Sequence, residues 1–191
     1  LPVKNMAELI AYAKQNPGKI SFGSSGVGAA AHLTSELIKQ TAGIDMVHVP
    51  YKGTAPALAD LVSGNIQLLL DVPIGVMSQV RAGKIKALCM LSKERVPGVE
   101  EVPTIVESGG PLIESSSWVM FLAPAGTPAE IIAKLQGDVA RAVKDEALRK
   151  RMAEQALVPV GATTADTAKF LQDEIDKWEK VITTAGVKVE V

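Results

Sequence analysis

Residues 21–28 read SFGSSGVG, a glycine-rich turn that joins a predicted strand at 20–23 to a predicted helix at 29–41. The helix is predicted because apolar residues recur at helical spacing until Gly43, a residue that is typical of helix ends. A strand, a glycine turn and a helix in this order form the unit from which parallel α/β sheets are built.

The same unit recurs towards the C-terminus, so the predicted fold class is α/β with an open, mostly parallel sheet. A helix precedes the first strand, because Glu8 follows Asn5 at the spacing of a capping pattern. The later elements are predicted as strands at 46–49, 66–70 and 85–91 and as helices at 55–62 and 74–81. These strands together predict a four-stranded sheet.

The composition of the sequence changes after residue 94, and we expect the chain to pass from one domain to another there. Residues 95–110 mix glycine, proline and charged residues, which favours an irregular segment. The elements predicted beyond it are strands at 118–122 and 157–160, a helix capped by Thr127 with Pro128 in its first turn, and helices at 145–155 and 164–185.

Composition excludes several classes of protein. The 20 basic and 21 acidic side chains are spread along the chain, so no patch for nucleic acid or for an anionic membrane is expected. The apolar stretch at 66–76 contains polar residues and is shorter than the ~20 residues that a membrane-spanning helix needs. The single cysteine, Cys89, has no partner for an intramolecular disulfide.

The loops that follow parallel strands gather at the carboxyl edge of the sheet, where ligands of open α/β folds bind. In the turn at 23–28 the glycines let the backbone approach a ligand, and the first N–H groups of the next helix have no intrahelical acceptor. Ser24 and Ser25 add hydroxyl donors, while the absence of a lysine argues against a phosphate loop. The turn therefore predicts a site for a small carboxylate, with glycines that serve packing alone as the alternative.

Two further turns are expected at the same edge. Residues 50–54 place Tyr51, Lys52 and Thr54 after the second strand, as a phenol, an ammonium and a hydroxyl that could face a ligand. A packing role for Tyr51 and a surface role for Lys52 are the alternatives. Asp71 closes a very apolar strand and needs a partner, either a ligand amine or hydroxyl or the first N–H groups of the next helix.

The spacing of reactive residues does not support a catalytic or cofactor site. Ser25 lacks the glycine two residues later that a nucleophile elbow requires, since Val27 stands there. His32 and His48 have no metal-ligating neighbours in the sequence and are interpreted as structural histidines. The turn departs from a dinucleotide fingerprint, because the expected acidic residue comes before the second strand rather than after it. We therefore expect no enzyme activity, no metal and no cofactor.

Several motifs spread over nearly the whole chain point to one family. They are SFGSSGVG at 21–28, HL at 32–33, VHVPYKG at 47–53, AGKIKAL at 82–88, EVPT at 101–104, SSW at 116–118 and LAPAGTP at 122–128. In this combination the sequence resembles the Bug receptors, the substrate-binding proteins of tripartite tricarboxylate transporters. Together the motifs are highly specific for that family.

The resemblance implies a two-domain, periplasmic-binding-protein-like (type II) fold that closes on a carboxylate or dicarboxylate held mainly by main-chain N–H groups. Residues 1–117 would form the second, ligand-binding α/β domain, and residues 118–191 the C-terminal part of the first domain. With Tyr51 added from its place in the turn, the predicted ligand-binding residues are Ser24, Ser25, Gly26, Val27, Gly28, Ala29, Tyr51, Lys52, Gly53, Thr54 and Asp71.

Bug receptors carry an N-terminal segment with its own ligand turn, and this sequence has none. The resemblance therefore implies a fragment, whose C-terminal helices are the return segment of an incomplete first domain. We expect the apolar faces of these helices to pack on the remaining domain or on another chain, which would produce self-association. Because half of the ligand donors are absent, we expect weak ligand binding.

The function implied by the resemblance is that of a periplasmic receptor, which delivers a small carboxylate to the membrane permease subunits of the transporter. The chain opens with Leu1-Pro2-Val3, so we expect that a signal peptide, not present in this chain, has been removed. Two alternatives are kept. One is the ligand-sensing effector domain of a regulator, normally attached to a helix-turn-helix, and the other is a small α/β enzyme acting on carboxylates.

Overall fold

Within residues 1–188, which the computed structural model describes, one sheet contains three short parallel strands. In the order in which they pair, the strands are β2 (Val47–Pro50), β1 (Ser21–Ser24) and β3 (Leu68–Leu69). Phe22 of β1 is in register with His48 of β2 and with Leu68 of β3. Because all three strands run in the same direction, their carboxyl ends lie at one edge of the sheet.

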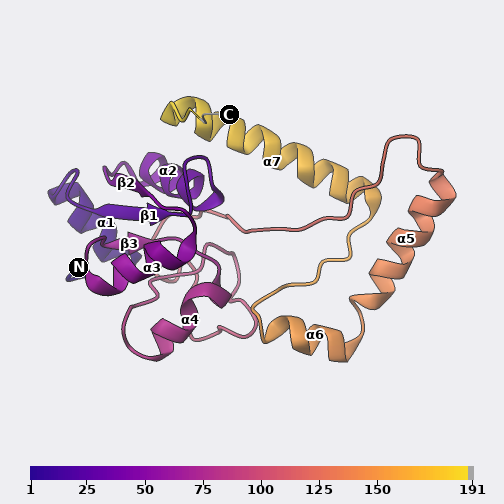
Figure 1. The fold of residues 1–191 in the computed structure, drawn as a ribbon, viewed down its shortest axis with the longest axis horizontal. Helices are drawn as coiled ribbons and strands as arrows, with labels where there is room; N and C mark the ends of the chain where they lie inside the picture. The colour runs from indigo at the N-terminus through magenta and orange to yellow at the C-terminus, as the bar shows by residue number, and fades with distance from the viewer. Residues whose placement is uncertain (189–191) are drawn as a thin grey trace.

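Two helices, α2 (Ala30–Ala42) and α3 (Thr54–Ser63), connect the strands. The chain crosses from β1 to β2 through α2 and from β2 to β3 through α3, in opposite directions across the sheet. Since such crossovers are right-handed, the two helices cover opposite faces, as Figure 1 shows. The order of strands thus reverses beside β1, which is the position where open α/β folds form their ligand crevice.

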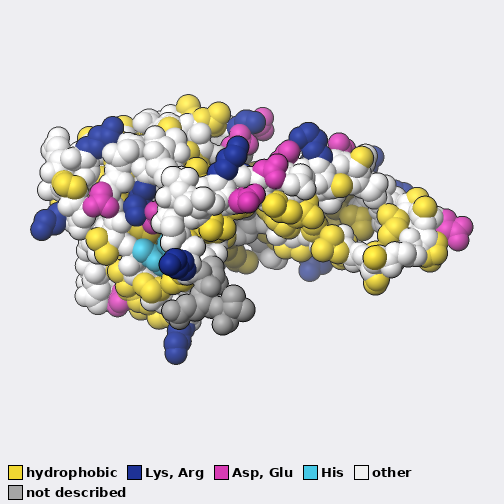
Figure 2. Space-filling view, turned by 90° about the horizontal axis from the view of Figure 1, so that it is seen from above, with side chains coloured by type: hydrophobic (Ala, Val, Ile, Leu, Met, Phe, Trp, Pro, Cys, Tyr) yellow, Lys and Arg dark blue, Asp and Glu magenta, His cyan; other side chains and the backbone are white. Residues whose placement is uncertain are grey.

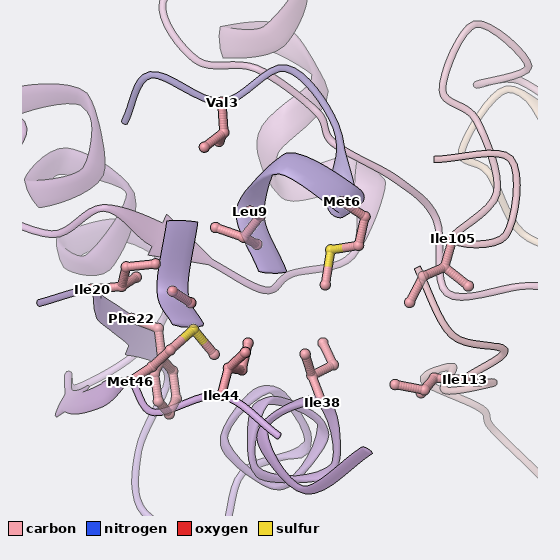
Figure 3. Close-up of a cluster of buried hydrophobic side chains, with 11 residues drawn as sticks. Val3, Met6, Leu9, Ile20, Phe22, Ile38, Ile44, Met46, Ile105 and Ile113 are labelled. Carbon is pink, nitrogen blue, oxygen red and sulfur yellow. The ribbon is translucent and has the colours of Figure 1, made fainter. Parts of the chain in front are cut away.

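The core is made by buried side chains that the strands share with α1 (Met6–Gln15) and α2 (Figure 3). The capping prediction for α1 is confirmed, because the Asn5 side chain accepts a hydrogen bond from Glu8 N at 2.8 Å. The buried members of this core are Val3, Met6, Leu9, Ala13, Ile20, Phe22, Ile38, Ile44, Met46, Ile105 and Ile113. Each large member stabilises the fold by about 1.5–3 kcal/mol through its transfer from water.

The predicted fourth strand is wrong. Residues 85–91 form only an isolated bridge, in which Met90 N donates to Pro103 O and Ile105 N donates to Met90 O, both at 2.8 Å. A helix, α4 (Pro73–Arg81), separates this segment from β3 as predicted. The segment then follows the irregular chain at 103–105 instead of the sheet, and its apolar residues still pack against the core.

The predicted strands at 118–122 and 157–160 are also wrong, although both segments are described by the structure. A strand requires a neighbour that accepts and donates its main-chain hydrogen bonds, and no such neighbour runs beside either segment in residues 1–188. Val119 and Phe121 are 97% and 86% exposed, so these apolar side chains lie outside any core of the described chain.

The three C-terminal helices form at the predicted places: α5 (Ala129–Ala142), α6 (Glu146–Ala153) and α7 (Thr164–Ala185). Asp145 and Thr163 cap α6 and α7 through their side chains. The cap of α5 differs from the prediction, because Pro128 occupies the N-cap position and Thr127 Oγ1 donates instead to Pro124 O at 2.8 Å.

The C-terminal helices differ in how they pack. The end of α7 lies on α2, where Val181 is buried and its carbonyl accepts a hydrogen bond from Gln40 at 3.3 Å. By contrast, α5 and α6 contain no buried residue and extend away from the sheet (Figure 1). The expectation that these helices pack on the rest of the chain therefore holds for the end of α7 and for the end of α6, where the Ala153 carbonyl lies against Gly98. It does not hold for α5, and packing on another chain stays a prediction.

Candidate functional site

The carboxyl edge of the sheet brings the three predicted turns together. Tyr51 N donates to Ser24 O at 3.0 Å, so the turn after β2 lies beside the glycine turn after β1. A Cβ atom placed on Gly75 of α4 would lie 3.6 Å from Asp71 Oδ2 and 3.7 Å from Thr54 Cγ2. The starts of α3 and α4 are therefore adjacent, and the sequence prediction of one shared edge is correct in its geometry.

Some main-chain N–H groups of the glycine turn are already engaged within the chain. Gly26 N donates to Ser24 Oγ at 3.2 Å, Gly28 N to His32 Nδ1 at 3.0 Å and Ala29 N to Gly26 O at 3.3 Å. These three groups, which the sequence offered as donors to a ligand, serve instead to shape the turn.

The open donors lie beside them, at the start of α2. Ala29 is the N-cap residue and makes no side-chain cap. Within residues 1–188 no acceptor is bonded to the N–H groups of Ser25, Val27, Ala30, Ala31 and His32. Unpaired N–H groups at a helix N-terminus, together with the positive end of the helix dipole, favour an anion.

The two serines of the turn lie in different environments. Ser24 is fully buried, and its hydroxyl oxygen lies 2.9 Å from Gly26 O and 2.6 Å from His48 Nε2. Its hydroxyl is thus occupied inside the protein, contrary to the expectation that it could donate to a ligand. Ser25 is exposed, so its hydroxyl is available at the edge.

Tyr51 has a packing role. Its hydroxyl donates to Asp60 Oδ2 at 2.7 Å, which raises the pKa of Tyr51 and lowers the pKa of Asp60. Its ring covers Gly23, where an added Cβ would lie 3.3 Å from Tyr51 Cε2 and 2.6 Å from Ile66 Cδ1. Gly23 is therefore required by this close approach, and the phenol is directed away from the edge.

The other residues of the second turn remain at the surface. Lys52 is exposed, and Gly53 takes the N-cap position of α3 with a φ of 108°, a conformation that favours glycine. Thr54 is the first residue of the helix, and neither it nor Gly53 provides a side-chain cap. The start of α3 is thus a second helix N-terminus without a side-chain cap at this edge.

Asp71 lies two residues beyond β3 and is exposed. Its Oδ1 atom accepts a hydrogen bond from Val72 N at 2.8 Å, just before Pro73 begins α4. This contact gives Asp71 a partner within the chain, but it is not the predicted cap, because no side chain caps the N–H groups of α4. It leaves Oδ2 directed towards the space between α3 and α4.

The two histidines lie against each other beneath the glycine turn, a feature that sequence reasoning missed. The His32 and His48 rings are stacked, with centroids 3.8 Å apart and an interplanar angle of 8°, and Phe22 stacks on His48 at 5.0 Å. Two signals could have located them: His32 follows Gly28 by one helical turn, and His48 is in register with Phe22. Histidine atoms reach the surface in Figure 2.

Both imidazoles are poor bases in this position. Burial, and then repulsion from His32, lowers the pKa of His48 from 6.5 to about 4. Burial also lowers the pKa of His32, with Glu36 opposing and Lys39 reinforcing the shift. Both rings are therefore neutral at pH 7.

No group of three His, Cys, Asp or Glu side chains in residues 1–188 is arranged to hold a metal ion. Burial raises the pKa of Cys89 to about 11, so its thiol is protonated and unreactive. No helix in this range is both long and apolar enough to cross a membrane.

The carboxyl edge is an open surface on this chain. Surface hollows of about 410 Å³ and about 480 Å³ lie elsewhere, the first between α2 and α7 and the second beside Lys4 and Lys86. Neither is lined by a predicted ligand-binding residue. A ligand bound at the edge would therefore be covered only on one side by the residues described.

Comparison with known proteins finds a family match and relatives over nearly the whole length of the chain. Residues 1–187 match the family model described as the tripartite tricarboxylate transporter family receptor. Protein BugT of Bordetella pertussis is 34% identical over 190 residues, an alignment that covers 100% of this chain and 58% of BugT.

Two solved structures from Rhodopseudomonas palustris share the fold. Rpa4515 with adipate has a TM-score of 0.83 and 37% identity, and the match covers 98% of this chain and 62% of that protein. MatC with bound malate has a TM-score of 0.74 and 31% identity, with 95% and 63% covered. These likenesses confirm the predicted periplasmic-binding-protein-like α/β class. The chain spans less than two thirds of the length of each of these proteins.

Proposed function

Because the chain belongs to the tripartite tricarboxylate transporter receptor family, we propose that it is part of a periplasmic receptor that captures a small carboxylate or dicarboxylate. The family is one of substrate-binding receptors rather than enzymes. The receptor would deliver its ligand unchanged to the membrane permease subunits of the transporter.

The observation that carries this proposal is the set of open N–H groups at the start of α2. They lie at the position where the strand order reverses, and within residues 1–188 no side chain caps them. The uncapped start of α3 is adjacent, and exposed Lys52 adds a positive charge. Such an edge suits a singly charged carboxylate group better than a phosphate, which would require more converging charge.

The related structures support a dicarboxylate as the ligand class. Adipate and malate, the molecules bound to Rpa4515 and MatC, both carry two carboxylate groups. We propose that one carboxylate binds at the start of α2, with donors from Ser25, Val27 and the first turn of the helix. The second carboxylate would then reach towards Lys52 or towards the other domain of the receptor.

We propose that residues 1–117 form one domain of this receptor and that residues 118–191 belong to the other. In support, the main core draws its buried side chains from residues up to Ile113, while Val119, Phe121 and Leu122 remain exposed. Hinge closure of two domains around the ligand would supply the donors that are missing from the open edge. On this chain alone the ligand would be held from one side, so weak binding is expected.

The test is a titration of the ¹⁵N-labelled chain with adipate, monitored through main-chain amide resonances. Amides of residues 25–32 should shift with adipate and not with neutral adipamide. Ala30→Glu places a carboxylate at the first position of α2, where it competes for the same donors, and should weaken adipate binding by roughly tenfold. Ala30→Gln, which has the same shape without the charge, is the matched control and should bind as the unaltered chain does.

Equal responses to adipate and adipamide would overturn the proposal, as would equal affinities of the Ala30→Glu and Ala30→Gln chains. Either result would mean that the start of α2 does not recognise negative charge.

A further inference from the structure

Two of the three internally bonded N–H groups of the glycine turn depend on the stacked histidines. Gly28 N donates directly to His32 Nδ1 at 3.0 Å. Gly26 N donates to Ser24 Oγ at 3.2 Å, and that oxygen lies 2.6 Å from His48 Nε2. The ring pair, with its centroids 3.8 Å apart, thus contacts Gly28 directly and is linked to Gly26 through the Ser24 hydroxyl.

The hydrogen bond to Gly28 fixes the protonation state of His32. A ring nitrogen that accepts an N–H group carries no proton, so neutral His32 must hold its proton on Nε2. A protonated imidazole has donors on both nitrogens and cannot accept from Gly28. The turn geometry seen here therefore requires a neutral His32.

Among residues 1–188, the charged groups that face the pair come from α2. Glu36 Oε1 lies 3.9 Å from His32 Nε2, and Lys39 bonds to Glu36 at 2.8 Å and lies over the Phe22 ring. The facing strands contribute uncharged Phe22 and Ser24. Burial keeps both rings neutral by lowering their pKa values, which agrees with the hydrogen-bonding pattern.

We propose that His32 and His48 are positioning residues of the anion-binding turn. The neutral stacked rings hold the N–H groups of Gly26 and Gly28 inward, so that the N–H groups of the neighbouring residues in the turn point outward. Protonation of His32 then releases Gly28 and loosens the turn. The anion-binding role of the turn rests on the proposed function, whereas the coupling between the rings and the turn does not.

The coupling is measured on the ligand-free ¹⁵N-labelled chain between pH 5 and pH 8. The Gly28 amide resonance should follow the protonation of the His32 ring with the same midpoint. In His32→Asn the side-chain oxygen takes the place of Nδ1 but does not titrate, so the Gly28 resonance should stay near its bonded position at every pH. In His32→Leu the acceptor is lost, and the resonance should be displaced at every pH.

A second pair of variants tests His48. His48→Gln keeps a hydrogen-bonding group near Ser24 Oγ, while His48→Leu removes it, so only the leucine variant should displace the Gly26 resonance. Ile38→Val is the control for lost packing, because Ile38 is buried on the same α2 helix but lies away from the turn. It should leave both glycine resonances unchanged.

Adipate titrations separate this inference from the proposed function. His32→Leu should lose about tenfold in affinity, which is the effect expected when the donors of a bound carboxylate are no longer oriented, and His32→Asn should restore it. If the unaltered chain binds no carboxylate while Gly28 follows the predicted pattern, the proposed function fails and the positioning role stands. If Gly28 is unaffected by His32→Leu, or still titrates in His32→Asn, the positioning role is overturned.

Discussion

Asp71 introduces a negative charge at an edge where the helix N-termini favour anions. Its Oδ1 atom is bonded to Val72 N, whereas Oδ2 lies in the space between Thr54 and Gly75. A carboxylate in this place repels a second carboxylate of the ligand and attracts an amino or hydroxyl group. We therefore expect Asp71 to affect the selectivity among ligands more than the binding of the carboxylate group that they share.

Asp71→Asn keeps the acceptor for Val72 and removes the charge. We expect this change to raise the affinity for adipate by roughly fivefold, because repulsion between nearby like charges at a surface is of that order. The gain in affinity should be smaller for malate, because its hydroxyl group can donate a stronger hydrogen bond to the charged carboxylate of Asp71 than to the neutral amide of asparagine. Competition titrations with the two acids measure the change in rank order, and an unchanged rank order would contradict a selective role for Asp71.

Because of His48, we expect the free energy of unfolding to depend on pH at mildly acidic values. Its pKa is about 4 in the folded chain and 6.5 when unperturbed, so between these values the unfolded chain binds the proton and the folded chain does not. The free energy of unfolding should therefore be fully maintained above pH 6.5 and should fall as the pH drops from 6.5 towards 4.

Urea unfolding at pH 7 and pH 5 tests this expectation. His48→Gln cannot titrate and should show a smaller difference between the two pH values than the unaltered chain. Carboxylates such as Glu101 and Glu107, whose pKa values are lowered by hydrogen bonds and by arginine neighbours, lose their contribution at lower pH and do not interfere. An equal pH dependence in the two chains would show that His48 is not the source.

At the scale of secondary structure, the sequence predicted the β1–α2–β2–α3–β3–α4 series because local signals are strong there. Periodicity located the helices, and Gly43 and Gly64 end α2 and α3 in the left-handed conformation. The strands at 85–91, 118–122 and 157–160 were wrong for one reason. Apolar, β-branched composition shows that a segment could pair, but it does not show that a partner strand is beside it.

The candidate site was predictable in position but not in detail. The glycine turn and its place at the carboxyl edge follow from the order of strand, glycine and helix. Which N–H groups stay open does not, because the engagement of Gly28 and Gly26 depends on His32 and on a histidine from another strand. Contacts of this kind arise from register and packing, which local patterns do not specify.

The caps of α1 and α6 should differ in their effect on stability, because α1 contributes buried residues to the core and α6 does not. Asn5→Ala removes the cap of α1, whose Met6, Leu9 and Ala13 are buried, and should lower the free energy of unfolding by about 1 kcal/mol. Asp145→Ala removes the equivalent bond to Leu148 N from α6, which has no buried residue.

The Asp145→Ala chain should therefore unfold at the same urea concentration as the unaltered chain when core unfolding is followed by the main-chain amide resonances of β1. The far-ultraviolet circular dichroism should show less helix in this variant, while the urea midpoint of core unfolding should not shift. Equal shifts from the two cap variants would mean that α6 and the sheet unfold together.

On the scale of the whole molecule, the four most exposed large apolar side chains of residues 1–188 all lie beyond residue 117. Val119, Phe121, Leu122 and Val160 are each more than three quarters exposed. Trp118 packs edge-on against Phe170 of α7 and donates a hydrogen bond to Glu174. Exposed apolar groups of this extent favour association with other protein surfaces.

We expect the chain to self-associate in a concentration-dependent manner. The double variant Val119→Ser, Phe121→Ser should shift the equilibrium towards monomer, because it removes two of the most exposed apolar side chains. Val62→Ser, at an exposed position on α3, is the control and should have little effect. Sedimentation equilibrium measures the association constants, and a chain that stays monomeric at all concentrations would contradict the expectation.

An acid anchored by main-chain N–H groups is recognised through atoms that nearly every residue type supplies. Substitutions at exposed positions such as Ser25 and Val27 would leave that anchor in place as long as the backbone keeps its path. Lys52 and Asp71 can also be replaced without loss of core packing, since neither contributes to the core. At the proposed site, the exchange of a few exposed side chains is therefore expected to change which acid is preferred, while the main-chain donors for the carboxylate group stay the same.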